Sequence, residues 1–483
     1  MKKSLFFILM FFVVSGCAEK HHEYSLPKHC NGHCSIASDS ASFYDAVINS
    51  SFRRSDCICI KGVLEDIQLK IDTSLTLAGK KDASSGISPG NSSLVISGKE
   101  IHINNLILTS SGKSAVEIKD AEKIKIDKVR IIKKAGSDED TAAVFIEGSR
   151  NVEIKSTKIE LLSEGSKNNI FGIYIKNSPE SILENILVDG LGNKNTAGIN
   201  IYNSSLRFKN LNIVNTSLQG LFADKSDIKG ETLTLRNMTA RSASLFIRNS
   251  KVDISEAEIE NISICPVFST GGKGVIFDGK DSGGSVSGLS VSQCDSNGVL
   301  LNDIGSLSMS EIILNNNLTG IWGQFRHENN NLQFKNVEMS ENLMSGFYFL
   351  GPCRLNIENA DIKRSKKIKF MNHNIGDGIV VASRRSMDEK CSLEFSSIKL
   401  HDNERAGMIF DSIYSSENQL QKAIKLENIS ITGAKNTEAR YGVVFQNGER
   451  PAEILDGIIY NEYEKNDSER VDNLGIVYDF SDF

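Results

Sequence analysis

The chain has 483 residues, of which 40% are hydrophobic and 7% aromatic, and its formal net charge is −6 at pH 7. Lys and Arg are scattered without basic clusters, so nucleic acid is not an expected partner. The single Trp and low aromatic content argue against a surface built throughout from sugar-stacking rings.

Residues 1–16 have the features of a secretory signal peptide. Lys2 and Lys3 precede an apolar run over residues 5–14, which is shorter than the roughly 18–20 residues needed to cross a bilayer. The run ends in the letters VSGC, which resemble the lipobox of bacterial lipoproteins. This resemblance implies cleavage before Cys17, acylation of its sulfur and a stable membrane anchor of two or three acyl chains. An alanine follows Cys17, which by the same resemblance favours the outer membrane or cell surface. An ordinary signal peptide with a chance cysteine is the alternative.

Residues 17–37 are expected to form a polar, lipidated tether. Beyond Cys17 the chain has eight cysteines, an even number that suits disulfides in an oxidising compartment. Four of them, whose pairing the sequence leaves open, lie close together at Cys30, Cys34, Cys57 and Cys59. A zinc site built with nearby histidines is the alternative, but the compartment favours disulfides, and we predict no metal site.

Residues 38–80 are expected to form an N-terminal cap and the first turns of the fold. Residues 39–48 suit a short helix, with Phe43, Ala46 and Val47 on one face and capping-box spacing from Ser42 to Asp45. Alternating strands follow over residues 57–79. A helix followed by such strands resembles the capped entry of right-handed parallel β-helix proteins, the pectate-lyase-like superfold.

Residues 81–460 repeat one pattern, in which a short alternating strand is followed by a turn and two further short strands. The repeat length is about 22–35 residues, and the strict alternation excludes a helical repeat. We predict an all-β, right-handed, single-stranded parallel β-helix with three short strands per turn and about 14–16 turns. Residues 461–483 are a C-terminal cap or tail. The first strands of the turns should begin near residues 115, 142, 171, 197, 219, 243, 273, 297, 319, 345, 376, 406 and 441.

Two sequence features should brace these turns. Asn recurs at the bend between second and third strands, where it tolerates left-handed backbone and its amide can bond along the stack. These bend positions are Asn185, Asn210, Asn336, Asn359 and Asn428. Cys353 and Cys391 precede the same strand in consecutive turns. A spacing of about 4.8 Å between turns suits a disulfide, so we predict the pair Cys353–Cys391.

The outward residues of the first strands form an apolar and aromatic stripe. Its aromatic members are Phe145, Tyr174, Phe222, Phe246, Trp322 and Tyr348. A stripe of this length exceeds the few hundred Å² of a usual exposed apolar patch, so it should be covered. Either long turns and stacking of like side chains cover it, or it is a groove for an extended polymer or a surface protein. In β-helix polysaccharide enzymes the substrate groove lies on this face, an analogy that adds modestly to the groove and leaves both alternatives open.

Ionisable residues beside the stripe are densest in the later turns. The candidate catalytic residues are His373, Asp377, His401 and Arg405. A lyase or epimerase needs a base and a cation that holds a carboxylate, and a lyase would make Ca²⁺ a cofactor. A hydrolase needs two opposed carboxylates, for which Asp377 with Asp402 or Glu404 is the available choice.

The sequence departs from the enzyme families of this superfold at their catalytic motifs. It lacks the Arg-x-Pro-x-x-Arg segment of pectate lyases, the Asn-Thr-Asp and Gly-His-Gly segments of polygalacturonases, and the Asp-Pro-His segment of alginate epimerases. We therefore expect a membrane-anchored binding or structural scaffold without a cofactor, with a polysaccharide or a surface protein as partner. A polysaccharide lyase, hydrolase or epimerase acting on the same face is the alternative.

Overall fold

The structure is a computed structural model. It describes residues 34–53, 57–82, 84–135, 139–163, 167–264, 271–327, 329–352, 354–366, 368–370, 373–382, 386–387, 391–411, 414–415, 424–432, 441–446, 458–461 and 476–477. The predicted signal peptide and Cys17 therefore lie outside the described residues. In the described part of the chain, no helix has the length and apolar character that crossing a membrane would require. The chain divides into two compact units, residues 1–217 and 218–483.

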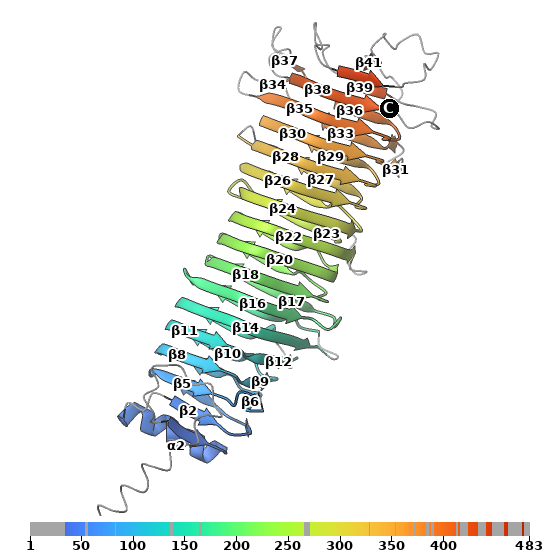
Figure 1. Cartoon of the computed structure of the whole chain (residues 1–483). Coiled ribbons are helices and arrows are strands. Elements are labelled where there is room, and N and C mark those ends of the chain that lie inside the picture. The colour runs from blue at the N-terminus through green and yellow to red at the C-terminus, as the bar shows by residue number, and fades with distance from the viewer. Residues whose placement is uncertain are drawn as a thin grey trace, which may run out of the picture. The chain divides into compact units, whose positions relative to one another are not determined.

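The first unit begins with a cap and continues as stacked turns of parallel strands (Figure 1). The cap consists of β1 (Cys34–Ala37) and α2 (Ser40–Arg53). The first strands of its turns are β4 (Leu69–Ile71), β7 (Leu94–Ile96), β10 (Ser114–Lys119), β13 (Thr141–Glu147), β15 (Ile170–Lys176) and β17 (Thr196–Tyr202). The second and third strands are β2 (Cys57–Ile60), β3 (Val63–Glu65), β5 (Leu75–Ala78), β6 (Gly86–Gly90), β8 (Lys99–Asn104), β9 (Ile107–Ser110), β11 (Glu122–Asp127), β12 (Arg130–Lys134), β14 (Arg150–Leu162), β16 (Ser181–Asp189) and β18 (Ser205–Val214).

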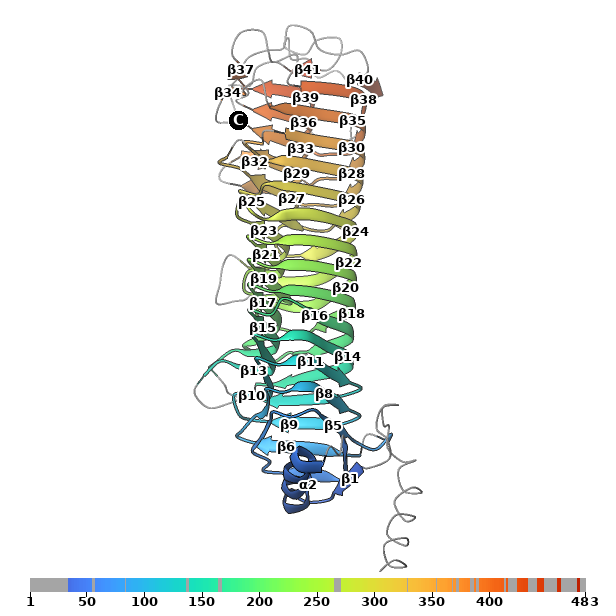
Figure 2. The same ribbon diagram turned by 90° about the vertical axis from the view of Figure 1, so that its left-hand side faces the viewer.

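The second unit is built from turns of the same kind, and Figure 2 shows its first strands stacked in order. These first strands are β19 (Leu221–Asp224), β21 (Ala243–Arg248), β23 (Lys273–Asp278), β25 (Val299–Asn302), β27 (Thr319–Gln324), β29 (Ser345–Leu350), β33 (Asp377–Ala382), β36 (Ala406–Asp411), β39 (Tyr441–Gln446) and β41 (Ile476–Val477). The second and third strands are β20 (Asp227–Ala240), β22 (Lys251–Ile264), β24 (Gly283–Cys294), β26 (Ser306–Asn315), β28 (Asn331–Ser340), β30 (Arg354–Lys363), β35 (Ser392–His401), β38 (Ile424–Thr432) and β40 (Ile458–Asn461). An antiparallel hairpin, β31 (Ile368–Phe370) with β32 (His373–Ile375), precedes β33, and β34 (Ser386–Met387) pairs with β37 (Tyr414–Ser415).

The predicted fold class is confirmed. The described residues form an all-β, right-handed parallel β-helix of about 14 turns with one short helix. Each first strand predicted from the sequence begins within two residues of its predicted start. The inward side chains make the core, as Val144, Ile173 and Ile199 illustrate with 0% exposure. Alternation thus predicts both the strands and the face that each strand buries.

The sequence predicts three separate strands in each turn, with a bend between the second and the third. In the later turns the two strands form one continuous strand, such as β14 or β20. The bend in β14 is a single residue, Ser156, with φ 47°. One left-handed residue redirects the chain while the hydrogen bonds to the neighbouring turns continue on both sides.

The asparagine ladder is present where it was predicted. Asn185 and Asn210 have φ values of 55° and 52°, and Asn210 Nδ2 donates to Asn185 Oδ1 at 2.7 Å. In the second unit Asn359 Nδ2 donates to Asn336 Oδ1 at 2.7 Å. These amides connect successive turns, which is a structural role.

The N-terminal cap corrects one sequence expectation. The capping pair is Asp39 and Ser42, three residues before the predicted pair of Ser42 and Asp45. Asp39 Oδ1 accepts the backbone N–H of Ser42 at 2.8 Å, and Ser42 Oγ accepts that of Asp39 at 3.2 Å. The helix is longer than predicted, while Phe43 and Ala46 are buried as expected.

A disulfide joins Cys34 in β1 to Cys57 in β2, with a Cα–Cα distance of 4.8 Å. These residues lie opposite each other in the parallel register, and Cys59 is buried beside them. The bond uses the Cys34 sulfur, which removes it from the alternative zinc site. No cluster of His, Cys, Asp and Glu that could hold a metal occurs among the described residues.

The structure describes only one residue of the predicted disulfide Cys353–Cys391. Cys391 is disulfide-bonded, and Cys353 lies outside the described residues. The residues that follow the two cysteines, Arg354 and Ser392, are direct partners in the β30–β35 register. The pairing stays a prediction that this register supports.

Candidate functional site

The predicted stripe exists on the first strands of the second unit, and its central part is open. We call Leu300, Trp322 and Tyr348 the outer strip, because they are direct partners on β25, β27 and β29 and point away from the core. All three are half-buried, whereas Ile276 on one side and Val380 on the other are 5% and 4% exposed. The described stripe is therefore accessible along a limited stretch.

Both ends of this stretch are closed by packing. On the later side Val380, Ala406 and Ile409 form a buried cluster against which Tyr348 packs. On the earlier side Phe222 and Phe246 meet edge to face at 5.3 Å, and the Arg248 guanidinium lies 5.3 Å above the Phe222 ring. Arg248 also pairs with Asp224 at 2.8 Å. At both ends the apolar side chains of the stripe are thus covered by packing against neighbouring side chains, as the first of the two alternatives predicts.

Trp322 and Tyr348 form a stacked aromatic pair at the centre. Their ring centroids are 4.3 Å apart and their planes differ by 13°. The two residues face each other on adjacent strands, so the strand spacing of about 4.8 Å sets this stacking distance. A stacked pair contributes about 0.5–1.5 kcal/mol beyond area burial, which holds both rings in place.

A row of polar side chains runs beside the outer strip, and we call Asp278, Asn302 and Gln324 the polar ladder. Each lies two residues after a member of the stripe, on the same outward face. Gln324 Nε2 donates to Asn302 Oδ1 at 2.8 Å, and Asn302 Nδ2 donates to Asp278 Oδ1 at 2.5 Å. The sequence contained a signal for the ladder, namely polar residues at one register position in three consecutive turns.

The first unit has an aromatic surface of its own. Phe145 and Tyr174 stack at 5.5 Å, and Tyr174 stacks on Tyr202 at 5.3 Å. Burial, followed by the nearby Glu147 and Asp140 carboxylates, raises the pKa of Tyr174. Tyr202, which the aromatic set proposed from the sequence omits, belongs to the neighbouring outward row.

The structure brings together two of the four candidate catalytic residues. Asp377 and Arg405 form a buried ion pair, in which Arg405 Nε donates to Asp377 Oδ1 at 2.6 Å and Nη2 donates to Oδ2. The Asp377 side chain has 0% exposure, and burial raises its pKa although Arg405 opposes this change. A carboxylate held in this way supports the fold and has no surface to offer a substrate.

The two histidines lie elsewhere. His401 ends β35, and its Nε2 lies 2.7 Å from Asp361 Oδ1 on the neighbouring strand β30. His373 begins β32 in the hairpin, and its side chain is outside the described part. In the described contacts Asp377 and Arg405 pair with each other, while His401 pairs with Asp361 and Asp402.

Comparisons with known proteins identify no family for this chain. Neither a protein-family model nor a curated protein sequence matches the chain. Among solved structures, the tailspike protein of E. coli bacteriophage HK620 in complex with pentasaccharide is similar, with a TM-score of 0.38 and 9% identity over 91% of this chain and 84% of that one. Two mutants of the same tailspike have TM-scores of 0.40 and 0.34, with 9% and 11% identity; they cover 91% and 84% of this chain and 84% and 74% of theirs. At these identities and TM-scores the likeness assigns no function to this chain.

Proposed function

We propose that this chain is a secreted, lipid-anchored bacterial scaffold that binds an extended polysaccharide on the outer strip of its second unit. The observation that carries the proposal is the half-buried, stacked Trp322–Tyr348 pair beside the polar ladder. Aromatic and other apolar side chains together with a few aligned polar groups are the usual composition of a small-molecule or cofactor site.

The two rows match the two kinds of surface on a sugar ring. The C–H face of a sugar is apolar and packs against apolar side chains such as those of the outer strip, while its hydroxyls donate and accept hydrogen bonds. In the ladder Gln324 uses one amide N–H toward Asn302. Its amide also carries a second N–H and an acceptor oxygen, which suit a hydroxyl.

Binding without turnover is the reading that the described residues favour. A hydrolase would need an accessible pair of carboxylates, and a lyase would need an accessible base. Asp377, the acid on which the hydrolase scheme depended, is buried against Arg405. Depolymerisation of a bound polymer by the wild-type protein would contradict this part of the proposal.

The single Trp of the chain makes the test direct. We expect the emission of Trp322 to shift when a panel of neutral and acidic polysaccharides is titrated into the Cys17-free protein. Trp322→Ala should weaken binding of the polysaccharide that shifts the emission about 10-fold or more, as for a central interface aromatic. Because this variant has no tryptophan, the affinities of the variants and the wild type are compared by calorimetric titration. Ile313→Ala, an exposed apolar residue on β26, is the matched control and should bind as wild type does. Unchanged emission with every polymer, or unchanged binding by Trp322→Ala, would refute the proposal.

The anchor is proposed from the lipobox and is tested separately. We expect the mature wild-type protein to carry acyl chains at Cys17 and to sediment with membranes. Cys17→Ser should lack the added mass and remain in the soluble fraction. A wild-type protein of unmodified mass would contradict the anchor without affecting the binding proposal.

A further inference from the structure

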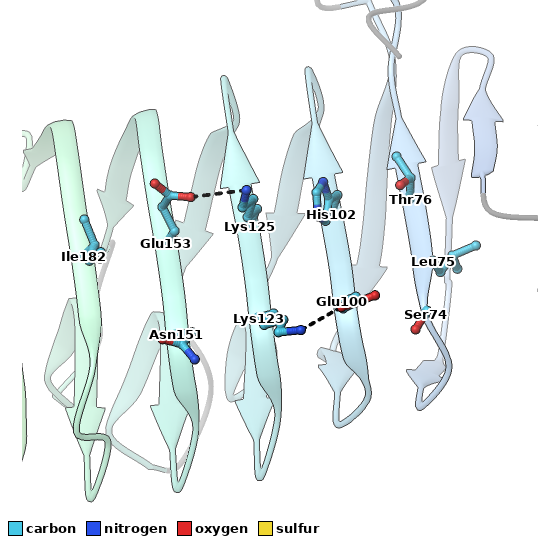
Figure 3. A pocket seen from close by; sticks show the side chains of 10 residues that line it. All are labelled: Ser74, Leu75, Thr76, Glu100, His102, Lys123, Lys125, Asn151, Glu153 and Ile182. Atoms are coloured by element: carbon cyan, nitrogen blue, oxygen red, sulfur yellow. Dashed lines mark hydrogen bonds and ion pairs between the residues drawn. The ribbon is translucent and has the colours of Figure 1, made fainter. Parts of the chain in front are cut away.

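A groove lies on another face of the first unit, outside the second strands. Its volume is about 670 Å³, and side chains from β5, β8, β11, β14 and β16 line it (Figure 3). Pockets for small ligands usually measure about 300–1,000 Å³, so the groove has a suitable size. The groove shares no residue with the outer strip, so ligand binding in the groove is independent of the proposed function.

Register brings its polar side chains into rows. Thr76, His102, Lys125 and Glu153 are successive partners on four neighbouring strands. Figure 3 shows them in one row, with Glu100 and Lys123 in a second row beside it. Ammonium, imidazole and hydroxyl groups therefore line one groove at intervals set by the strand spacing.

The ion pairs around the groove are unequal in strength. Glu153 Oε1 lies 2.6 Å from Lys155 Nζ, and Lys155 also contacts Glu184 at 3.0 Å. These two carboxylates raise the pKa of Lys155 to about 12. Lys125 Nζ is 3.8 Å from Glu153, whereas Lys123 is 2.8 Å from Glu100. Because Glu153 is held mainly by Lys155, Lys125 is the cation of the groove with the weakest protein partner.

We propose that this groove binds a short saccharide that carries an oxyanion, with the anionic group at Lys125 and His102. A carboxylate or sulfate would accept charge-assisted hydrogen bonds from Lys125, a stronger contact than the 3.8 Å pair it replaces. Ser74 and Asn151 line the same groove and are exposed, so sugar hydroxyls can reach their side chains.

Calorimetric titration of the Cys17-free protein tests the site with three probes: a galacturonate trisaccharide, a sulfated galactose trisaccharide and the neutral galactose trisaccharide. We expect at least one acidic probe to bind and the neutral probe to bind at least about 10-fold more weakly. The two acidic arms decide between carboxylate and sulfate. Failure of both to bind with a Kd below about 1 mM, or equal binding of the neutral probe, would overturn the proposal.

Substitutions test whether the acidic probe binds in this groove. Lys125→Gln should weaken the acidic probe about 10-fold or more, as loss of a charge-assisted contact predicts. Lys335→Gln is the matched control, since Lys335 on β28 pairs with Glu358 at 3.0 Å on an equivalent second strand of the other unit. Glu153→Gln should tighten binding, because it removes the carboxylate that competes for Lys125. Unchanged binding by Lys125→Gln, or weaker binding by Glu153→Gln, would contradict the site.

A last variant separates this proposal from the proposed function. Trp322→Ala should bind the acidic trisaccharide as the wild-type protein does. Loss of trisaccharide binding in Trp322→Ala would place the ligand on the outer strip and overturn the groove as its site.

Discussion

A few ionisable residues among the described ones are buried, and some of these pair with a residue of the neighbouring turn. Asp377 starts β33, Arg405 directly precedes β36, and their side chains meet across adjacent turns without exposed carboxylate surface. Removing one partner of such a pair leaves the other charge uncompensated. Replacing both by apolar residues of similar volume is often neutral.

For the ion pair, we expect Asp377→Ala to lower the free energy of unfolding by about 3–5 kcal/mol. The double variant Asp377→Leu with Arg405→Met should recover most of this loss. Urea denaturation followed by circular dichroism provides the measurement. If Asp377→Ala were as stable as the wild type, the pair would not be structural, and the catalytic hypothesis for Asp377 would regain support.

Lys133 predicts a pH dependence of stability. Its side chain is 0% exposed, and burial lowers its pKa from 10.5 to about 8. Below pH 8 the folded state holds a charge that the unfolded state solvates better, so stability rises as pH increases from about 8 to 10.5. Lys133→Met should therefore be more stable than wild type by about 3 kcal/mol at pH 7. This difference should shrink toward pH 10.5, and a pH-independent difference would contradict the assignment.

At the scale of the element, one left-handed residue decides how a strand bends. Asn210 has φ 52° and bonds to Asn185 in the turn before it. Most side chains pay about 1–2 kcal/mol for this backbone conformation, whereas Gly does not. An alanine at this position therefore loses the side-chain hydrogen bond to Asn185 and also adopts a strained left-handed backbone conformation.

Substitution at Asn210 should follow a fixed order of stability. We expect Asn210→Gly to cost about 1 kcal/mol, the value of one hydrogen bond, and Asn210→Ala about 2 kcal/mol. Thermal denaturation of the two variants beside the wild type gives the comparison. An alanine variant more stable than the glycine variant would show that backbone strain is unimportant there.

The strands were predictable because alternation is a local property that repeats in every turn. The same reasoning could not find contacts between side chains far apart in sequence. Asp377 and Arg405 are 28 residues apart, and their pairing depends on how adjacent turns align. The buried asparagines that bond to backbone carbonyls of the preceding turn, such as Asn317 to Val291, were missed for this reason. The groove at Lys125 was missed because alternating Lys and Glu on outward positions are typical of any solvated strand.

At the scale of the whole molecule, stability is distributed over many similar turns. In a solenoid each turn contacts its neighbours, so a local defect should stay local. In the second unit Phe347 packs against Phe334 at 5.4 Å and Phe349 at 5.5 Å, and all three are at most 1% exposed. This aromatic cluster is a suitable place for a defect that acts on the core alone.

Phe347→Ala should cost about 3–5 kcal/mol in the turns that contain it, because it leaves a cavity among large side chains. Hydrogen exchange resolved by mass spectrometry should show faster exchange in β27, β29 and β33, which are Phe347's own strand and its two neighbours. Amides of β13 and β15 in the first unit should keep their protection, because the penalty is confined to adjacent turns. Leu343→Ala, at a position with 41% exposure, is the control for loss of a large apolar side chain. Equal loss of protection in both units would show that the chain unfolds as one cooperative body, and stability would then have to be assigned to the whole chain instead of to its turns.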